Sequence, residues 1–275
     1  MRARFGQRLY GAELDYRMAL TTATRIMVQF DATVARITLD HAPLNIIDIP
    51  MMEELSAAIA EVDSRPEISA LVLGAKGKAF SAGVDVAAHK PDRIPEMLAK
   101  FHGVIKALVA TKKVTIAAVH GACLGGGAEL AMVCDMVFTA RDATWAFPEI
   151  KLGCYPPVAC TALAALVGQK KATELILTGR TISGDEAVAI GLANKSALAE
   201  QVPALVDDTL EHLKRLSPAA LSVTKKAIYA WDSMHFDKGL ARAEKVYLDE
   251  LMKTEDAVEG IQAFLEKREP RWRAR

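Results

Sequence analysis

The sequence lacks an excess of charge of either sign. Its 34 Lys and Arg residues balance 34 Asp and Glu residues, so the formal net charge of the 275 residues is zero. Nucleic-acid-binding surfaces usually carry a basic excess, and the balance therefore predicts no nucleic-acid partner. The balance does not exclude a small basic pocket for a phosphorylated ligand.

Cysteine is scarce. Cys123, Cys134, Cys154 and Cys160 show no paired CxxC spacing, and no histidine lies at a zinc-finger interval. We therefore expect buried, reduced thiols in a cytoplasmic protein, and no bound metal.

Long apolar runs are also missing. None reaches the roughly 18 residues that span a bilayer, so no membrane association is expected. Residues 1–25 contain arginines but no continuous apolar segment, which argues against a secretory signal. We expect them to form a poorly ordered N-terminal extension.

Neither glycine-rich segment matches a phosphate-binding loop. GACLGGGAEL (121–130) lacks a Gly-Lys-Ser/Thr ending and the GxGxxG spacing, and GAKGKAF (74–80) fails the same test. A dinucleotide-dependent dehydrogenase is therefore disfavoured.

Short apolar runs alternate with helical patterns in the first two thirds of the chain. Hydrophobic residues make up 51% and charged residues 25%, as in ordinary globular proteins. Four runs have the composition of strands: 34–40, 69–75, 114–121 and 136–140. Two helical stripes lie between them, namely Met52, Leu55, Ile59 and Val62, then Met97, Phe101, Ile105 and Leu108.

Helical patterns dominate from about residue 158. Ser183 and Glu186 have the spacing of a capping box, and amphipathic helices are expected over 218–231, 239–252 and 255–268. The sequence predicts an α/β core followed by a helical C-terminal region.

Two loops of small residues are candidates for binding an oxygen atom. Gly125, Gly126 and Gly127 can bring bare backbone close to a ligand and then begin a helix whose first N–H groups are unpaired. A tight turn without a ligand fits equally well. KAFSAGVDV (78–86) has small residues at 81–83, although an ordinary turn explains it when it is taken alone. Together, one N–H from each loop could form an oxyanion hole.

Two acids lie in apolar surroundings nearby. Glu129 falls in the first turn of the helix after the glycines, where burial raises a carboxyl pKa and the helix N-terminus opposes that shift. It could instead cap its own helix. Glu149 lies in WAFPEIKLG (145–153) and could instead be a surface acid. Jointly the acids and loops indicate proton transfer beside a stabilised oxyanion.

Five stretches in order resemble the crotonase (enoyl-CoA hydratase/isomerase) superfamily over residues 30–270. They are KAFSAGVDV, VTIAAVHGACLGGGAELAMVCD, FPEIKLG, LTGRTISGDEAVAIGLANK and EGIQAFLEKREPRW. The resemblance implies a crotonase-like α/β spiral of ββα units over 26–195. It also implies a helical oligomerisation region over 196–275 that forms a homotrimer or a dimer of trimers.

The resemblance further implies an acyl-CoA substrate and no cofactor, because coenzyme A is part of that substrate. The N–H groups of Ala82 and Gly126 would hold its thioester oxygen. Both glutamate positions of the family's hydratases are occupied, with Glu149 serving the α-carbon proton and Glu129 activating water. Further substrate contacts are implied for Ser81, Gly83, Asp85, Gly125, Phe147, Tyr155, Pro156, Phe264 and Lys267. Asp85 could instead order its loop, and Phe264 and Lys267 could be a core aromatic and a solvated lysine.

The chain departs from the family pattern near the acyl pocket. CYPPVACTAL (154–163) replaces a Pro-Gly-x-Gly-Gly-like segment, adding bulk beside Glu149; Phe147 replaces a frequent Gln; and DHAPLN lacks the basic residue that contacts a CoA phosphate. SAGVDVAAHKPD with GCYPPVA is most similar to cyclohexa-1,5-diene-1-carbonyl-CoA hydratases of anaerobic aromatic degradation.

Hydration of a conjugated enoyl- or dienoyl-CoA is therefore the leading hypothesis. The alternatives are a 3,2-trans-enoyl-CoA isomerase and a general short-chain enoyl-CoA hydratase. A non-catalytic RNA-binding relative is disfavoured, because the charge is balanced and both acids are present.

Overall fold

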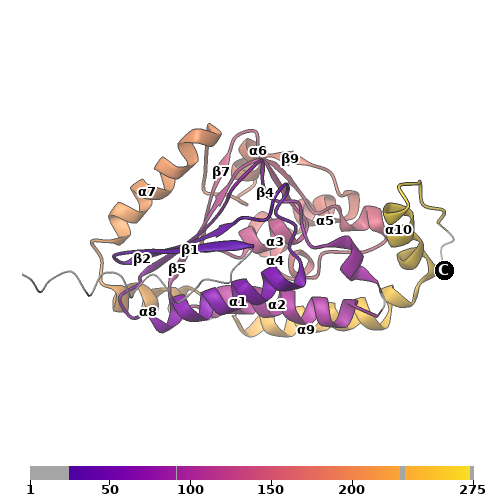
Figure 1. Cartoon of the computed structure of the whole chain (residues 1–275), viewed down its shortest axis with the longest axis horizontal. Coiled ribbons are helices and arrows are strands. Elements are labelled where there is room, and N and C mark those ends of the chain that lie inside the picture. Colours follow the sequence, from indigo (N-terminus) through magenta and orange to yellow (C-terminus); the bar gives the residue numbers. More distant parts are fainter. Residues whose placement is uncertain (1–24, 91, 230–232, 273–275) are drawn as a thin grey trace, which may run out of the picture.

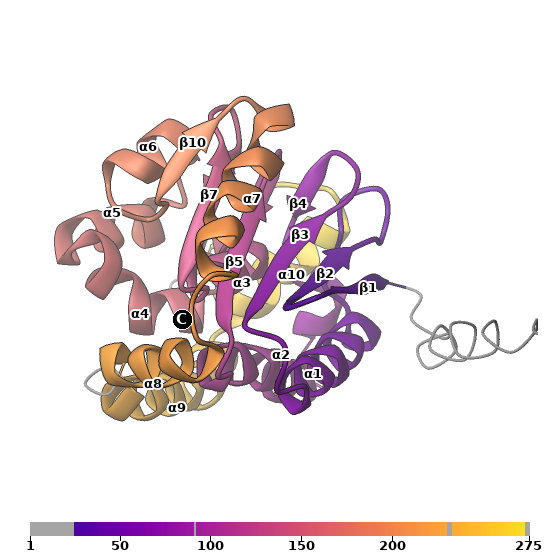
Figure 2. The ribbon, with the colours of Figure 1, turned by 90° about the vertical axis from the view of Figure 1, so that its left-hand side faces the viewer.

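Strands alternate between two sheets in the computed structural model, which describes residues 25–90, 92–229 and 233–272. The larger sheet has the strand order β1-β2-β3-β5-β7-β10 and the smaller one β4-β6-β8-β9. Three times in succession, a strand of the larger sheet is followed by one of the smaller sheet and then by a helix. The predicted spiral of ββα units is thus confirmed (Figure 2).

The strands of the larger sheet are β1 (Ile26–Asp31), β2 (Val34–Leu39), β3 (Ala70–Ala75), β5 (Val114–Val119), β7 (Met136–Ala140) and β10 (Lys195–Ala197). Those of the smaller sheet are β4 (Ala79–Ser81), β6 (Ala122–Leu124), β8 (Thr144–Ala146) and β9 (Ile182–Ser183). Pairing is parallel except at one edge of each sheet, where β1 meets β2 and β9 meets β8. The four predicted strands are confirmed; the short strands of the smaller sheet have too few residues to show a pattern.

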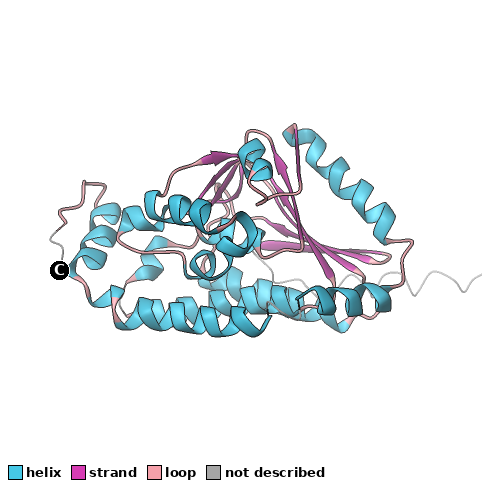
Figure 3. Cartoon of the chain, turned by 180° about the vertical axis from the view of Figure 1, so that it is seen from behind, coloured by secondary structure: helices cyan, strands magenta, loops and turns pink. Residues whose placement is uncertain are grey.

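The helices are α1 (Ile49–Ser64), α2 (Ile94–Ala110), α3 (Gly126–Met132), α4 (Pro157–Val167), α5 (Gln169–Thr178), α6 (Gly184–Ala189), α7 (Val202–Leu213), α8 (Pro218–Tyr229), α9 (Ser233–Asp249) and α10 (Glu255–Leu265). Short 3₁₀ turns are η2 (Val86–His89), η3 (Pro148–Leu152), η4 (Ala199–Gln201) and η5 (Leu251–Lys253). In Figures 1 and 3, α1, α2, α8 and α9 run along one side of the sheets, and α10 lies at the far end.

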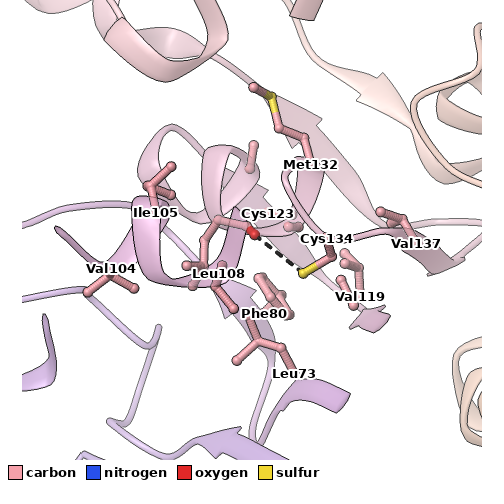
Figure 4. Close-up of a cluster of buried hydrophobic side chains, with 14 of the residues drawn as sticks. Leu73, Phe80, Val104, Ile105, Leu108, Val119, Cys123, Met132, Cys134 and Val137 are labelled. Carbon is pink, nitrogen blue, oxygen red and sulfur yellow. Dashed lines mark hydrogen bonds between the residues drawn. The ribbon is translucent and has the colours of Figure 1, made fainter. Parts of the chain in front are cut away.

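Both predicted helical stripes are buried, and they form much of the core. Asp48 begins α1 by accepting a hydrogen bond from the Met51 N–H, and Pro50 fits the first turn because its missing N–H has no helical partner to lose. Figure 4 shows residues of α2, including Val104, Ile105 and Leu108, beside strand residues such as Leu73 and Val119.

Two local expectations are corrected. Cys123, Cys134 and Cys154 are buried thiols as expected, but Cys160 is exposed on α4. The capping box is half formed: Ser183 accepts from the Glu186 N–H at 3.1 Å, whereas the Glu186 carboxylate binds Arg180 at 2.7 Å. A charged guanidinium is a stronger partner for a carboxylate than a backbone N–H.

The predicted division at residues 195/196 stays a prediction. Strand β10 lies across that boundary and pairs with β7, and α7 packs on β5 and β7 of the larger sheet. Residues 1–24 of the expected extension lie outside the described residues. Trimerisation and a cytoplasmic location stay predictions. None of the helices in the described ranges is at once long and apolar enough to cross a membrane.

A buried ion pair attaches α8 to the larger sheet. Lys225 lies 2.8 Å from the Asp135 carboxylate and also donates to the Lys113 carbonyl at 2.8 Å. The same carboxylate oxygen accepts the Thr115 N–H at 2.7 Å. Both side chains are nearly buried, so each charge depends on the other for compensation.

We expect Lys225→Ala to lower the free energy of unfolding by about 3 kcal/mol, because it leaves Asp135 buried without its cation. Urea unfolding measures this. Lys226→Ala is the matched control, since Lys226 is exposed on the same helix. Equal effects of the two substitutions would contradict the role of the pair.

Candidate active site

One apolar cavity of about 480 Å³ brings together residues from distant parts of the chain. Its walls come from the loop after β4, the start of α3, turn η3, helix α2 and the end of α10. The predicted site residues that line it are Ala82, Gly83, Gly125, Gly126, Glu129, Glu149, Tyr155, Pro156 and Phe264.

The two predicted loops approach each other closely. Gly83 has a φ of 105°, and a Cβ there would lie 3.0 Å from the Leu124 carbonyl oxygen and 3.7 Å from the Gly126 nitrogen. Gly125, with a φ of 50°, also occupies a conformation that favours glycine. Small residues are therefore required here, because a side chain on either loop would push the backbones apart.

The two predicted oxyanion donors differ in their present partners. Gly126 begins α3, so its N–H has no acceptor within the helix. The Ala82 N–H instead donates to the Leu44 carbonyl at 2.9 Å. A thioester oxygen would have to share or replace that bond, and the two-donor oxyanion hole stays a prediction.

Glu129 is buried and is held by another helix. Its Oε1 accepts the N–H groups of Val158 and Ala159 at 2.8 and 2.9 Å, at the start of α4. The alternative in which Glu129 caps its own helix is therefore wrong. Burial raises the pKa of Glu129 to about 7, although the two hydrogen bonds oppose this shift.

Glu149 lies in turn η3, close to Gly125. Its Oε1 is 2.5 Å from where a Cβ on Gly125 would lie, and its Oε2 is buried without a hydrogen-bond partner in the part of the chain that the structure describes. Burial, and secondarily the charge of Glu129, raise the pKa of Glu149 well above its usual value. The surface-acid alternative is wrong, and the two carboxyl groups repel each other's ionised forms.

The bulky segment that departs from the family pattern lies partly where it was expected, because Tyr155, Pro156 and Pro157 line the cavity together with Glu149. Val158, also expected to add bulk there, does not line the cavity and donates its N–H to Glu129. Pro157 starts α4 and has no N–H of its own, so the next two N–H groups of the helix are those that bind the carboxylate.

Four predicted contact residues do not line the cavity: Ser81, Asp85, Phe147 and Lys267. The Ser81 hydroxyl donates to the Asn45 carbonyl at 2.7 Å, and Phe147 is packed in the core with 1% exposure. Asp85 accepts a hydrogen bond from the Ala87 N–H and so orders its own loop, which was the alternative to a substrate contact. Lys267 is exposed beyond α10.

Sequence reasoning missed several lining residues. Met97 and Phe101 were expected only as core positions of α2, yet they also face the cavity. His89 and Arg268 supply polar groups from η2 and from beyond α10. Burial lowers the pKa of His89. A helical stripe does not distinguish a core contact from a cavity wall, so no sequence signal marked these residues.

The buried charge of Glu129 makes a prediction about stability. Since the pKa is raised on folding, the folded state holds its proton more tightly, and stability falls as pH rises from about 4.5 to about 7. As pH rises from 4.5 to 8, we therefore expect the free energy of unfolding of Glu129→Gln to increase by about 3 kcal/mol relative to that of wild type.

Urea unfolding across this pH range measures the difference. Glu200→Gln is the control, because Glu200 is exposed. Parallel pH dependences of wild type and Glu129→Gln would contradict the buried ionisation.

These features suit acid–base chemistry, because two buried carboxyl groups with raised pKa values share an apolar cavity with a backbone donor at a helix start. The enoyl-CoA hydratase/isomerase family model matches residues 29–275. The chain belongs to this family, and the expected enzyme type, an enoyl-CoA hydratase-like hydro-lyase, is confirmed by that membership.

Individual relatives agree. A cyclohexa-1,5-dienecarbonyl-CoA hydratase of Thauera aromatica is 36% identical over 253 residues, covering 91% of this chain and 97% of the relative. A probable enoyl-CoA hydratase of Bacillus subtilis is 34% identical, with 90% and 98% covered. The crystal structure of an enoyl-CoA hydratase from Mycobacterium avium subsp. paratuberculosis superposes with a TM-score of 0.82 at 26% identity, covering 91% of this chain and 99% of that one.

Proposed function

We propose that the protein adds water to the double bond of a conjugated enoyl- or dienoyl-CoA thioester. The observation that carries the proposal is the pair of buried carboxyl groups, Glu129 and Glu149, on one apolar cavity. An isomerase needs only one acid to move a proton between two carbons, whereas hydration has to handle both a water and a carbon-bound proton. The retained pair therefore favours hydration.

The raised pKa values support a division of labour. Near neutral pH, Glu129 with a pKa of about 7 is partly ionised, and the charge of Glu129 disfavours ionisation of Glu149. We assign water activation to ionised Glu129, whose Oε1 is fixed by α4. Protonated Glu149 then delivers its proton to the α-carbon.

Negative charge on the thioester oxygen needs hydrogen-bond donors. The Gly126 N–H is the first proposed donor, since it begins α3 and lines the cavity. The Ala82 N–H is the second, and it exchanges its bond to the Leu44 carbonyl for one to the thioester. In this scheme the chain supplies every acid, base and donor, and no cofactor beyond substrate coenzyme A is proposed.

The proposed substrate is a cyclic dienoyl-CoA. Its support is the similarity to the hydratase of Thauera aromatica and the apolar wall formed by Tyr155, Pro156 and Pro157. In a cyclic diene conjugated to the thioester, charge still collects on the same oxygen, so the donors keep their role.

Incubation of the protein with crotonyl-CoA and with a cyclic dienoyl-CoA tests this. Loss of the conjugated thioester absorbance is expected with both, faster with the cyclic substrate. A rise in that absorbance with a 3-enoyl-CoA and no hydration would instead identify an isomerase. A steeply salt-dependent shift of RNA on a gel, without turnover of either thioester, would support a binding protein.

A further inference from the structure

The structure contains a second cavity, of about 630 Å³. Its walls come from the end of α3, with Met132 and Val133, from α4, with Cys160 and Ala162, and from α9, with Phe236 and Val246. Helix α9 packs against α4 along this region. The proposed chemistry does not use this space.

The lining of the second cavity suits a hydrocarbon. Its side chains are mostly apolar, and two of its polar residues are already engaged. Asp135 is paired with Lys225, and the Thr161 hydroxyl donates to the Pro157 carbonyl at 2.9 Å. An alkyl chain bound here would remove its own apolar surface and that of the lining from water.

Tyr155 borders both cavities. Among the described residues it is the only one that lines both. Its hydroxyl donates to the Ala243 carbonyl at 2.5 Å, and its ring meets Tyr247 edge to face, with centroids 5.1 Å apart. Burial raises the pKa of Tyr155, so the phenol stays protonated and keeps this bond. The ring is therefore a fixed wall between α9 and η3.

The second cavity is also close to the reacting groups. Met132 and Val133, which line it, lie three and four residues after Glu129 in the sequence.

The geometry points to Tyr155 as the residue that sets acyl-chain length. Its ring ends the acyl-binding cavity, and removing it joins a second apolar cavity that accepts a longer hydrocarbon chain. This inference rests on the proposed function, because it takes the ligand to be an acyl-CoA thioester. It adds a specificity-determining residue that takes no part in the chemistry.

Calorimetric titration with saturated butanoyl-, octanoyl- and dodecanoyl-CoA tests it without turnover. In wild type, we expect affinity to stop rising once the first cavity is filled. In Tyr155→Ala, dodecanoyl-CoA should bind at least tenfold more tightly than in wild type, because each newly buried methylene is worth about fourfold. Butanoyl-CoA should change less than threefold.

Three further variants sharpen the result. Tyr155→Leu also removes the ring and should show the same gain, so the outcome does not depend on how one variant folds. Tyr155→Phe keeps the wall and loses only the bond to Ala243, so its profile should match wild type. Adding Ala162→Phe to Tyr155→Ala fills the second cavity and should remove the gain. Unchanged dodecanoyl-CoA binding in both Tyr155→Ala and Tyr155→Leu would overturn the inference, as would a gain that Ala162→Phe leaves intact.

Turnover of crotonyl-CoA, measured on the same proteins, separates this inference from the proposed function. Absence of hydration together with the expected affinity series would refute the hydratase assignment and leave the role of Tyr155 standing. Hydration together with acyl-CoA affinities that do not change with the residue at position 155 would refute the role of Tyr155 and leave the hydratase assignment standing.

Discussion

Glu149→Gln is expected to lower kcat for hydration by about 10³-fold or more, while affinity for butanoyl-CoA changes by only a few-fold. Glutamine keeps the shape of the side chain but cannot donate a proton to carbon, and positioned acid–base groups contribute about 10²–10⁴-fold. Because its raised pKa keeps Glu149 largely protonated, a neutral amide is also a close electrostatic substitute. The binding site should therefore survive the change.

Steady-state turnover of crotonyl-CoA and calorimetric binding of the saturated thioester measure the two quantities. Glu200→Gln, an exposed glutamate changed in the same way, should behave as wild type in both. Unchanged turnover in Glu149→Gln would remove Glu149 from the mechanism. A matching loss of binding would instead make it a residue that maintains the cavity.

Gly126→Ala is expected to lower kcat/KM by about 10²–10³-fold, the loss associated with one misplaced oxyanion donor. A Cβ on Gly126 would lie 2.6 Å from Val84 Cγ2 and 3.2 Å from Phe101 Cζ. Both side chains line the cavity, so the start of α3 has to shift or the cavity has to narrow. Either change moves the N–H away from the thioester oxygen.

Gly103→Ala is the matched control, because a Cβ there has no heavy atom within 4 Å. Gly103 lies within α2, where alanine favours the helix by roughly 0.5–1 kcal/mol, so this variant should be slightly more stable and fully active. Thermal unfolding and initial rates compare the two variants. Full activity in Gly126→Ala would show that no donor is needed at the start of α3.

Much of the fold could be predicted, because local sequence patterns coincide with helices and strands of the structure. The stripe of Met52, Leu55, Ile59 and Val62 has the helical period, and all four residues are buried in α1. The apolar runs that became β2, β3, β5 and β7 were long enough to show a strand pattern. The strands of the smaller sheet are two or three residues long, too short for any period, and so were not predicted.

The candidate site was predictable in part for the same reason. Glycine and alanine in two loops revealed where backbones can approach, and an acid among apolar neighbours revealed Glu129. The partner of Glu129, in contrast, lies 29 and 30 residues further along the chain. No sequence feature near Val158 or Ala159 indicates that their N–H groups donate to a carboxylate.

By itself, then, the sequence determined the α/β class, the family, the two loops and the two acids, because each depends on residue type and short-range spacing. Only the tertiary structure decided that the Ala82 N–H donates to the Leu44 carbonyl, that Arg268 reaches the cavity and that Tyr155 lines two cavities. Those outcomes depend on which distant segments meet, and packing across the whole chain selects such contacts. The sequence around Leu44, Arg268 and Tyr155 does not indicate whether the carbonyl, the guanidinium or the aromatic ring faces solvent, core or substrate.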